Sequence, residues 1–166
     1  FTYLCDPAWG ASERAAVASL QKPKEGTPKT ESCWVCIPTG GSSGGIRFAR
    51  HDERTLTAAV GGFCAHFGLE RVNAVGVLPP HHVSGLMARV RCAATGGEYV
   101  DGDWKALAAG DLPALAPGRS WTLSLVPTQL QRLLGVAAAV DWLRRFEIIF
   151  LGGGPTWPDL AAAAAQ

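Results

Sequence analysis

A glycine- and serine-rich segment at residues 38–48 has the composition of a loop that binds phosphate. It reads Pro-Thr-Gly-Gly-Ser-Ser-Gly-Gly-Ile-Arg-Phe and follows an apolar run, residues 33–37, that is typical of a short buried strand. Glycines let the backbone approach a ligand closely, and successive N–H groups in such a turn form a concave nest for anions. Serine hydroxyls add further donors. The segment is therefore predicted to cradle phosphate groups.

Spacing excludes two familiar phosphate motifs. Gly40 and Gly45 have the Walker spacing, but Ile46 and Arg47 stand where Lys and Ser/Thr belong. The dinucleotide pattern of glycines at i, i+2 and i+5 is absent both here and at residues 152–154. On composition alone, a flexible Gly/Ser turn without a ligand remains an open alternative.

Four blocks, in order, resemble the motifs of the AMP-forming acid–CoA ligases, the adenylating superfamily. Residues 39–48 are similar to the Thr/Ser/Gly-rich phosphate loop, with Gly40 in place of a serine and Ile-Arg-Phe in place of Pro-Lys-Gly. Residues 78–86 resemble the Leu-Pro-x-x-His-x-x-Gly block, residues 124–130 the Val-Pro-Thr block, and residues 151–155 the Leu-Gly-Gly-Ala-Pro loop. Within the family, His-Val-Ser-Gly-Leu-Met and Val-Pro-Thr-Gln-Leu-Gln-Arg-Leu-Leu are most similar to the o-succinylbenzoate–CoA ligase branch.

The resemblance implies an enzyme that activates a carboxylic acid with ATP and transfers it to coenzyme A. The acid, o-succinylbenzoate in menaquinone or phylloquinone biosynthesis, would attack the α-phosphorus, and the thiolate of coenzyme A would then displace AMP. Implied cofactors and co-substrates are ATP, Mg²⁺ and coenzyme A. Nucleotide binding falls to Thr39, Gly40, Gly41, Ser42, Ser43, Gly44, Gly152, Gly153, Gly154 and Pro155. Catalysis falls to His82 and Arg47, and the acid pocket to His82, Ser84 and Gly85; no metal ligand is implied in this chain.

The chain also departs from the family. The Tyr-Gly-x-Thr-Glu block with its Mg²⁺-binding Glu, the ribose-binding Asp, the hinge and the C-terminal catalytic Lys are not found in these 166 residues. Residues 1–166 are therefore expected to be part of an N-terminal AMP-binding domain that does not turn over alone. Two other interpretations stay open: a ligase for another acyl or aryl acid, and a non-catalytic nucleotide-binding module.

Composition and charge narrow the class of protein. Hydrophobic residues make up 48% and charged residues 17%, as in a globular chain with a sizeable core. A net charge of +1 and a pI near 7.8 give no basic footprint for nucleic acid. No apolar run approaches the roughly 18 residues of a membrane span. Five irregularly spaced cysteines favour packed, reduced thiols over metal or redox work, and hence the cytoplasm. A homodimer is left open.

Alternating strand and helix patterns predict an α/β fold, a largely parallel sheet flanked by helices, as in the AMP-binding domain of acyl-CoA synthetases. Strands are expected at residues 1–4, 33–37, 46–49, 72–78, 98–100, 121–126 and 147–151. Helices are expected at residues 12–20 with Ser12 as N-cap, 52–67, 84–94, 127–134, 141–145 and 156–165. The loops after residues 39, 79 and 151 leave strand ends, where α/β sheets bind ligands. His51, His66 and His81 are expected at the surface or at caps.

Overall fold

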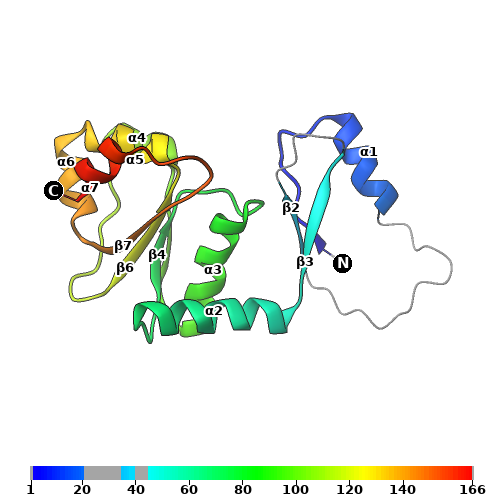
Figure 1. Ribbon diagram of the computed structural model, residues 1–166, viewed down its shortest axis with the longest axis horizontal. Coiled ribbons are helices and arrows are strands. Elements are labelled where there is room, and N and C mark those ends of the chain that lie inside the picture. Colours follow the sequence, from blue (N-terminus) through cyan, green and yellow to red (C-terminus); the bar gives the residue numbers. More distant parts are fainter. Residues whose placement is uncertain (1, 21–34, 40–44, 166) are drawn as a thin grey trace.

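The computed structural model describes residues 2–20, 35–39 and 45–165, which form two sheets with helices around the larger one (Figure 1). The larger sheet contains β4 (Asn73–Gly76), β5 (Tyr99–Asp101), β6 (Trp121–Leu125) and β7 (Phe146–Leu151). Their order is β5-β4-β6-β7, and every neighbouring pair is parallel. The predicted α/β class with a largely parallel sheet is confirmed.

Helices cover both faces of this sheet. On one face, α2 (Glu53–Phe67) and α3 (Val83–Thr95) pack through Phe63 and Cys92 against Ala74 of β4. On the other lie α4 (Trp104–Ala108), α5 (Pro127–Leu134), α6 (Ala137–Leu143) and α7 (Pro158–Ala164). Their leucines bury the neighbouring residue Val75. Successive strand residues point to opposite faces, so a strand buried on both faces is apolar throughout.

The smaller sheet holds the strand that leads into the predicted phosphate loop. It consists of β1 (Thr2–Tyr3), β2 (Val35–Thr39) and β3 (Arg47–His51), in that order, with helix α1 (Ala11–Leu20) after β1. β1 pairs with β2 in parallel, and β3 returns antiparallel to β2, as expected for residues 46–49. The phosphate-loop strand thus lies outside the parallel sheet, a separation that the alternating pattern did not reveal.

Helix α2 begins and ends where the sequence predicts. The Asp52 carboxylate accepts a hydrogen bond from the Thr55 amide at 2.8 Å, and the Thr55 hydroxyl accepts one from the Asp52 amide. This capping box satisfies amides that would otherwise lack partners. Gly68 ends the helix at φ 66°, a conformation that glycine adopts without strain.

The structure differs from the sequence prediction at three helices for identifiable reasons. Ser12 is not an N-cap, because the Arg14 amide already donates to Gly10 and the helix starts at Ala11. Helix α6 begins at Ala137 rather than at residue 141, because the alanine-rich stretch before Asp141 is itself helical. Helix α4 was not predicted, although the carboxylate of Asp103 caps it by accepting from the Ala106 amide at 2.9 Å. Among the described residues, no helix is long and apolar enough to cross a membrane.

Candidate active site

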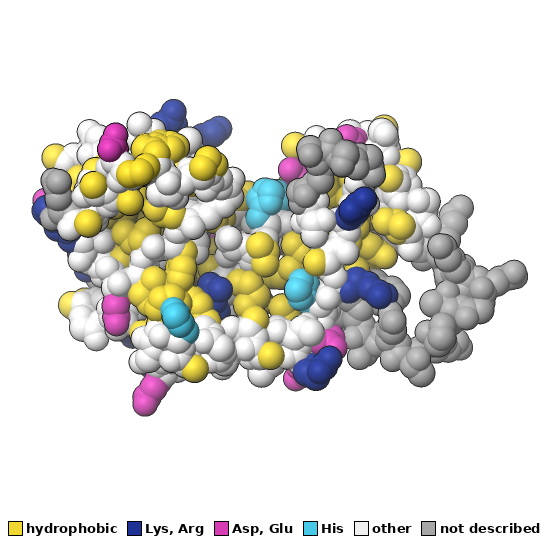
Figure 2. All heavy atoms as spheres, viewed as in Figure 1, with side chains coloured by type: hydrophobic (Ala, Val, Ile, Leu, Met, Phe, Trp, Pro, Cys, Tyr) yellow, Lys and Arg dark blue, Asp and Glu magenta, His cyan; other side chains and the backbone are white. Residues whose placement is uncertain are grey.

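A cleft of about 780 Å³ separates the small sheet from the carboxyl ends of the parallel strands. Figure 2 shows this hollow, with hydrophobic side chains lining it and histidines near its edge. One wall comes from β2 and β3, and the other from α3 and the exits of β4, β6 and β7. The lining residues are Ile37, Pro38, Thr39, Ala49, His51, Leu78, His82, Val83, Ser84, Met87, Arg91, Ser124, Leu125, Val126, Phe150, Leu151, Gly152 and Gly153.

Thr39, the first residue of the predicted phosphate loop, lies in the wall formed by the small sheet. It ends β2, and its hydroxyl donates to the Arg47 carbonyl at 3.4 Å across the β2–β3 pair. Gly40, Gly41, Ser42, Ser43 and Gly44 fall outside the described residues. Arg47 begins β3 opposite Thr39, with an exposed side chain, and is not one of the residues that line the cleft.

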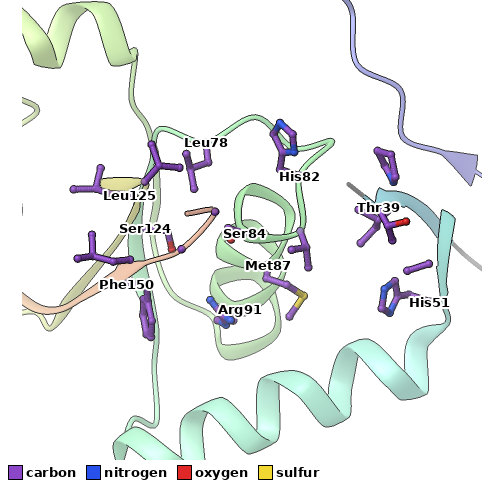
Figure 3. Close-up of a pocket in the computed structure, with 18 residues that line it drawn as sticks. Thr39, His51, Leu78, His82, Ser84, Met87, Arg91, Ser124, Leu125 and Phe150 are labelled. Atoms are coloured by element: carbon purple, nitrogen blue, oxygen red, sulfur yellow. The ribbon is translucent and has the colours of Figure 1, made fainter. Parts of the chain in front are cut away.

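His82 and Ser84 line the opposite wall, at the start of α3 (Figure 3). His82 is the N-cap of α3, and its imidazole makes no capping hydrogen bond. Gly85 lies behind this wall rather than in it. A Cβ at Gly85 would stand 2.2 Å from the Pro79 carbonyl oxygen and 2.4 Å from that of Leu78. Only glycine lets α3 approach the loop that carries His82 this closely.

The loop after β7 contributes two of its four predicted residues. Gly152 and Gly153 line the cleft, whereas Gly154 and Pro155 are exposed beyond it. The Gly152 amide donates to the Leu125 carbonyl at 3.1 Å, which continues the β6–β7 pairing past the strand ends. Gly153 has a φ of 80°, so the chain turns there in a conformation that favours glycine. Backbone without side chains therefore faces the cleft at this edge of the sheet.

Arg91, which sequence reasoning missed, carries the positive charge of the cleft. Its guanidinium carbon lies 3.9 Å from the ring centre of Phe63 and 5.7 Å from that of Phe150. Among the described residues, its Nε is the buried side-chain polar atom that lacks a hydrogen-bond partner. No described carboxylate lies within ion-pair distance of it. Burial lowers the pKa of this guanidinium, but an arginine remains protonated inside proteins.

Arg91 therefore has the properties of an anion anchor. Figure 3 shows it projecting from α3 toward the side of the cleft where Phe150 lies. A buried charge and an unsatisfied donor both cost free energy unless a partner compensates them. The sequence signal was an arginine at the ninth position of α3, which by itself is indistinguishable from a solvent-facing charge.

Two histidines lie elsewhere than predicted. His51 is half-buried and lines the cleft from β3, and the His81 side chain is only 12% exposed and faces Asp6. His66 is exposed in the last turn of α2, with its ring edge-on to Phe67, as expected. His51 faces the cleft because strand β3 forms part of the cleft wall. No local sequence pattern indicates this position.

The described cysteines are free thiols. Cys36 and Cys92 are buried, Cys64 is half-buried and Cys5 is exposed. Among residues 2–20, 35–39 and 45–165, no group of three His, Cys, Asp or Glu side chains is placed to hold a metal ion.

Comparison with known proteins confirms the resemblance to the AMP-forming acid–CoA ligases. No model of a protein family matches the chain. In sequence it is 31% identical over 170 residues to a probable 2-succinylbenzoate–CoA ligase of Mycobacterium tuberculosis, found in strains CDC 1551 / Oshkosh and H37Rv. That alignment covers 96% of this chain but 43% of the relative, so the chain spans less than half the length of the curated relatives it matches.

Solved structures give the same fold. Wild-type E. coli MenE with a bound m phenylether-linked analogue of OSB-AMS is 26% identical, with a TM-score of 0.61 over 79% of this chain and 27% of that one. ATP-bound MatB from Rhodopseudomonas palustris is 17% identical, with a TM-score of 0.62 over 79% of this chain and 26% of that one. The second likeness concerns the fold alone. The chain has part of the AMP-binding fold of acyl-CoA ligases.

Proposed function

We propose that residues 1–166 are part of the N-terminal AMP-binding domain of an o-succinylbenzoate–CoA ligase. The whole protein would adenylate this acid with ATP and transfer the acyl group to coenzyme A, within menaquinone or phylloquinone biosynthesis. The names of the mycobacterial relative and of the ligand bound to E. coli MenE support this choice of acid. Free thiols at the four described cysteines fit a reducing compartment, so we place the reaction in the cytoplasm.

The observation that carries the proposal is the Arg91 side chain in the cleft, whose buried Nε has no hydrogen-bond partner and with which no described carboxylate pairs. The acid has two carboxylates, and only one of them reacts with ATP. The other would be carried into a largely apolar cleft, where an unpaired carboxylate is costly. Arg91 can bind it with a planar fork of donors, while Phe63 and Phe150 hold that fork in place. An acid with a single carboxylate would leave Arg91 unsatisfied.

The first half-reaction brings two anions together. A carboxylate oxygen attacks the α-phosphorus, and pyrophosphate leaves with the bonding electrons of the α,β-bridge. Catalysis of such a step depends on positioning and on donors aimed at developing charge. Thr39 and the following glycines and serines would bind the β- and γ-phosphates, and Arg47 would approach them from β3. The bare backbone at Gly152 and Gly153 would receive the adenine face.

In the second half-reaction the thiolate of coenzyme A attacks the acyl carbon and AMP leaves. His82 would act in this step; its exposed position at the edge of the cleft, beside the half-buried Ser84, supports this role. A histidine in this position can exclude water or guide the thiol without itself reacting. The acid would lie between His82 and Arg91, along the side of α3 that faces the cleft.

The test is acid-dependent exchange of pyrophosphate into ATP by the full-length protein. We expect exchange with o-succinylbenzoate and at most a few per cent of that rate with benzoate or octanoate. Faster pyrophosphate exchange with octanoate or benzoate than with o-succinylbenzoate would show that the protein is a ligase for a fatty or aryl acid instead. No exchange with any acid, in a protein that still binds ATP, would leave a non-catalytic nucleotide-binding module.

A further inference from the structure

A contact between Asp6 and His81 links the small sheet to the loop that carries His82. Their Oδ2 and Nε2 atoms lie 3.5 Å apart, and the side chains are 34% and 12% exposed. Asp6 follows β1, whereas His81 lies between β4 and α3. The contact therefore bridges the two walls of the cleft. Either the imidazolium or the neutral tautomer with its proton on Nε2 can donate to this carboxylate.

Asp6 is held in place from its own side of the cleft. Its other carboxylate oxygen, Oδ1, accepts from the Ala8 amide at 2.8 Å, and its carbonyl accepts from the Trp9 amide at 3.1 Å. Arg14 of α1 then donates to the carbonyls of Trp9 and Pro7, at 2.9 and 3.1 Å. The turn thus binds one carboxylate oxygen of Asp6, while Oδ2 faces His81.

The turn that holds Asp6 is connected through β1 to β2, the strand that leads into the predicted phosphate loop. β1 pairs in parallel with β2, and the Leu4 amide donates to the Cys36 carbonyl at 2.9 Å. β2 then continues through residues that line the cleft and ends at Thr39. We therefore expect a shift of Asp6 relative to the parallel sheet to displace Thr39 as well.

On the other side, His81 is coupled to His82. The two rings lie 4.5 Å apart between centres, at 49° to one another. The His82 amide donates to the Pro79 carbonyl at 3.1 Å, and the His82 carbonyl accepts from the Leu86 amide at 3.0 Å. His81 thus occupies a tight turn whose next residue lines the cleft and begins α3.

We propose that Asp6 and His81 form a positioning pair that fixes the Thr39 wall against the His82 wall and so sets the geometry in which ATP and acid meet. This inference rests on the proposed function, because its effect is on turnover. A partly exposed ion pair contributes little to stability. Misplacement of reacting groups by about 1 Å, in contrast, can cost two orders of magnitude in rate. The pair acts through His82 and Thr39 and touches no reacting atom.

The experiment compares Asp6→Asn, His81→Gln and the double variant in the full-length ligase. Asparagine keeps the acceptor for the Ala8 amide but loses the charge that faces His81. We expect each single variant to lower kcat about tenfold, with KM for ATP and the midpoint of thermal unfolding nearly unchanged. The double variant should be no slower than either single one, because both remove the same contact. Asp6→Glu should recover part of the rate.

The matched control is Asp141→Asn, which breaks the exposed Asp141–Arg144 pair of α6, whose oxygen and nitrogen are 3.1 Å apart. It should change neither kcat nor the unfolding midpoint. Any of three results would overturn the proposal. The first is a kcat of Asp6→Asn equal to that of the wild type, and the second is a loss of kcat that only follows a lower unfolding midpoint. The third is additive effects of the two substitutions in the double variant.

A second measurement separates this inference from the proposed function. Hydrogen exchange at the His82 amide should become faster in Asp6→Asn, because the turn that contains its hydrogen bond to Pro79 loses its anchor. This readout needs no activity. If the unmodified protein exchanges no pyrophosphate, the proposed function fails, while the positioning pair is decided by the His82 amide. An unchanged rate of hydrogen exchange at the His82 amide in Asp6→Asn would contradict the positioning pair.

Discussion

The guanidinium of Arg91 lies 3.9 Å from the ring centre of Phe63, in a cleft where no described carboxylate pairs with it. Its neighbour on the same helix, Arg89, also lies over a ring, that of Tyr99 at 4.6 Å, but its Nη2 is 3.0 Å from the Asp101 carboxylate. Arg89 is thus paired with a carboxylate within the protein, whereas the charge of Arg91 is available to bind a ligand.

This difference predicts opposite outcomes for two similar substitutions. Arg91→Met should raise KM for o-succinylbenzoate about 10- to 100-fold, because a hydrogen bond to a charged group is worth about 1.5–3 kcal/mol. It should leave the free energy of unfolding nearly unchanged, since it removes a partly buried charge without an ion-pair partner while keeping apolar contact with Phe63. Arg89→Met should leave KM unchanged. Steady-state kinetics and urea unfolding of both variants give the comparison, and equal KM values would refute the anchor.

Gly85 is expected to tolerate no side chain. The Cβ of Gly85→Ala would meet backbone carbonyl oxygens of Leu78 and Pro79, so α3 and the loop bearing His82 must separate. We expect a loss of about 2 kcal/mol or more in the free energy of unfolding, as for other overpacked sites. Gly62→Ala in α2 is the control, because a Cβ there has nothing within 4 Å and alanine favours a helix. The free energy of unfolding in denaturant should fall for Gly85→Ala and rise for Gly62→Ala. An unchanged free energy of unfolding in Gly85→Ala would be inconsistent with this packing.

The phosphate loop yields a ranking of two variants. Gly41→Val should lower the adenylation rate more than Arg47→Ala, because a branched side chain would close the nest of amides that the sequence predicts at residues 39–44. Loss of one donor that acts in the transition state costs roughly 3–4 kcal/mol. Single-turnover adenylation by the full-length variants measures both, and equal losses would show the ranking to be wrong.

Cys92 predicts part of the alkaline stability profile. Burial raises the pKa of its thiol to about 11 from an ordinary value of 9.0. Between these pH values the unfolded chain releases a proton that the folded chain retains, so the free energy of unfolding falls as pH rises. Cys92→Ala should lose stability at every pH and show a shallower fall between pH 9 and 11. Cys5→Ala, at an exposed thiol, is the control. An unchanged slope in Cys92→Ala would contradict the assignment.

The 166-residue chain by itself should give no pyrophosphate exchange, whereas the full-length protein should. The Mg²⁺-binding Glu block and catalytic Lys implied by the family motif are not found in its sequence. Exchange by the isolated chain, at a rate above that of a Gly41→Val version of it, would overturn this expectation.

Local patterns predicted most elements because their signals are local. Asp52 and Gly68 bound α2 through hydrogen bonds within one turn, and Pro127 and Pro158 open α5 and α7 at positions that need no amide donor. The separation into two sheets depends instead on pairings between distant strands, which no window of sequence contains. Helix α4 is only five residues long, too short for a period to show.

The sequence motifs name five of the residues that line the cleft, but they also name Arg47, Gly85, Gly154 and Pro155, which do not line it. Thr39, His82, Ser84, Gly152 and Gly153 come together in one cleft. Arg91 and His51 do not belong to the blocks recognised in the sequence. Arg91 is important because it packs beside Phe63 and Phe150, and His51 because β3 forms a wall of the cleft.

The most direct test of the account is a crystal structure of the full-length protein with a non-hydrolysable o-succinylbenzoyl-adenylate analogue. We expect the free carboxylate of the acyl group within hydrogen-bond distance of the Arg91 guanidinium, and the nucleotide between residues 39–44 and the backbone of Gly152 and Gly153. An analogue bound outside this cleft, or bound in it with Arg91 turned away from the carboxylate, would contradict the account.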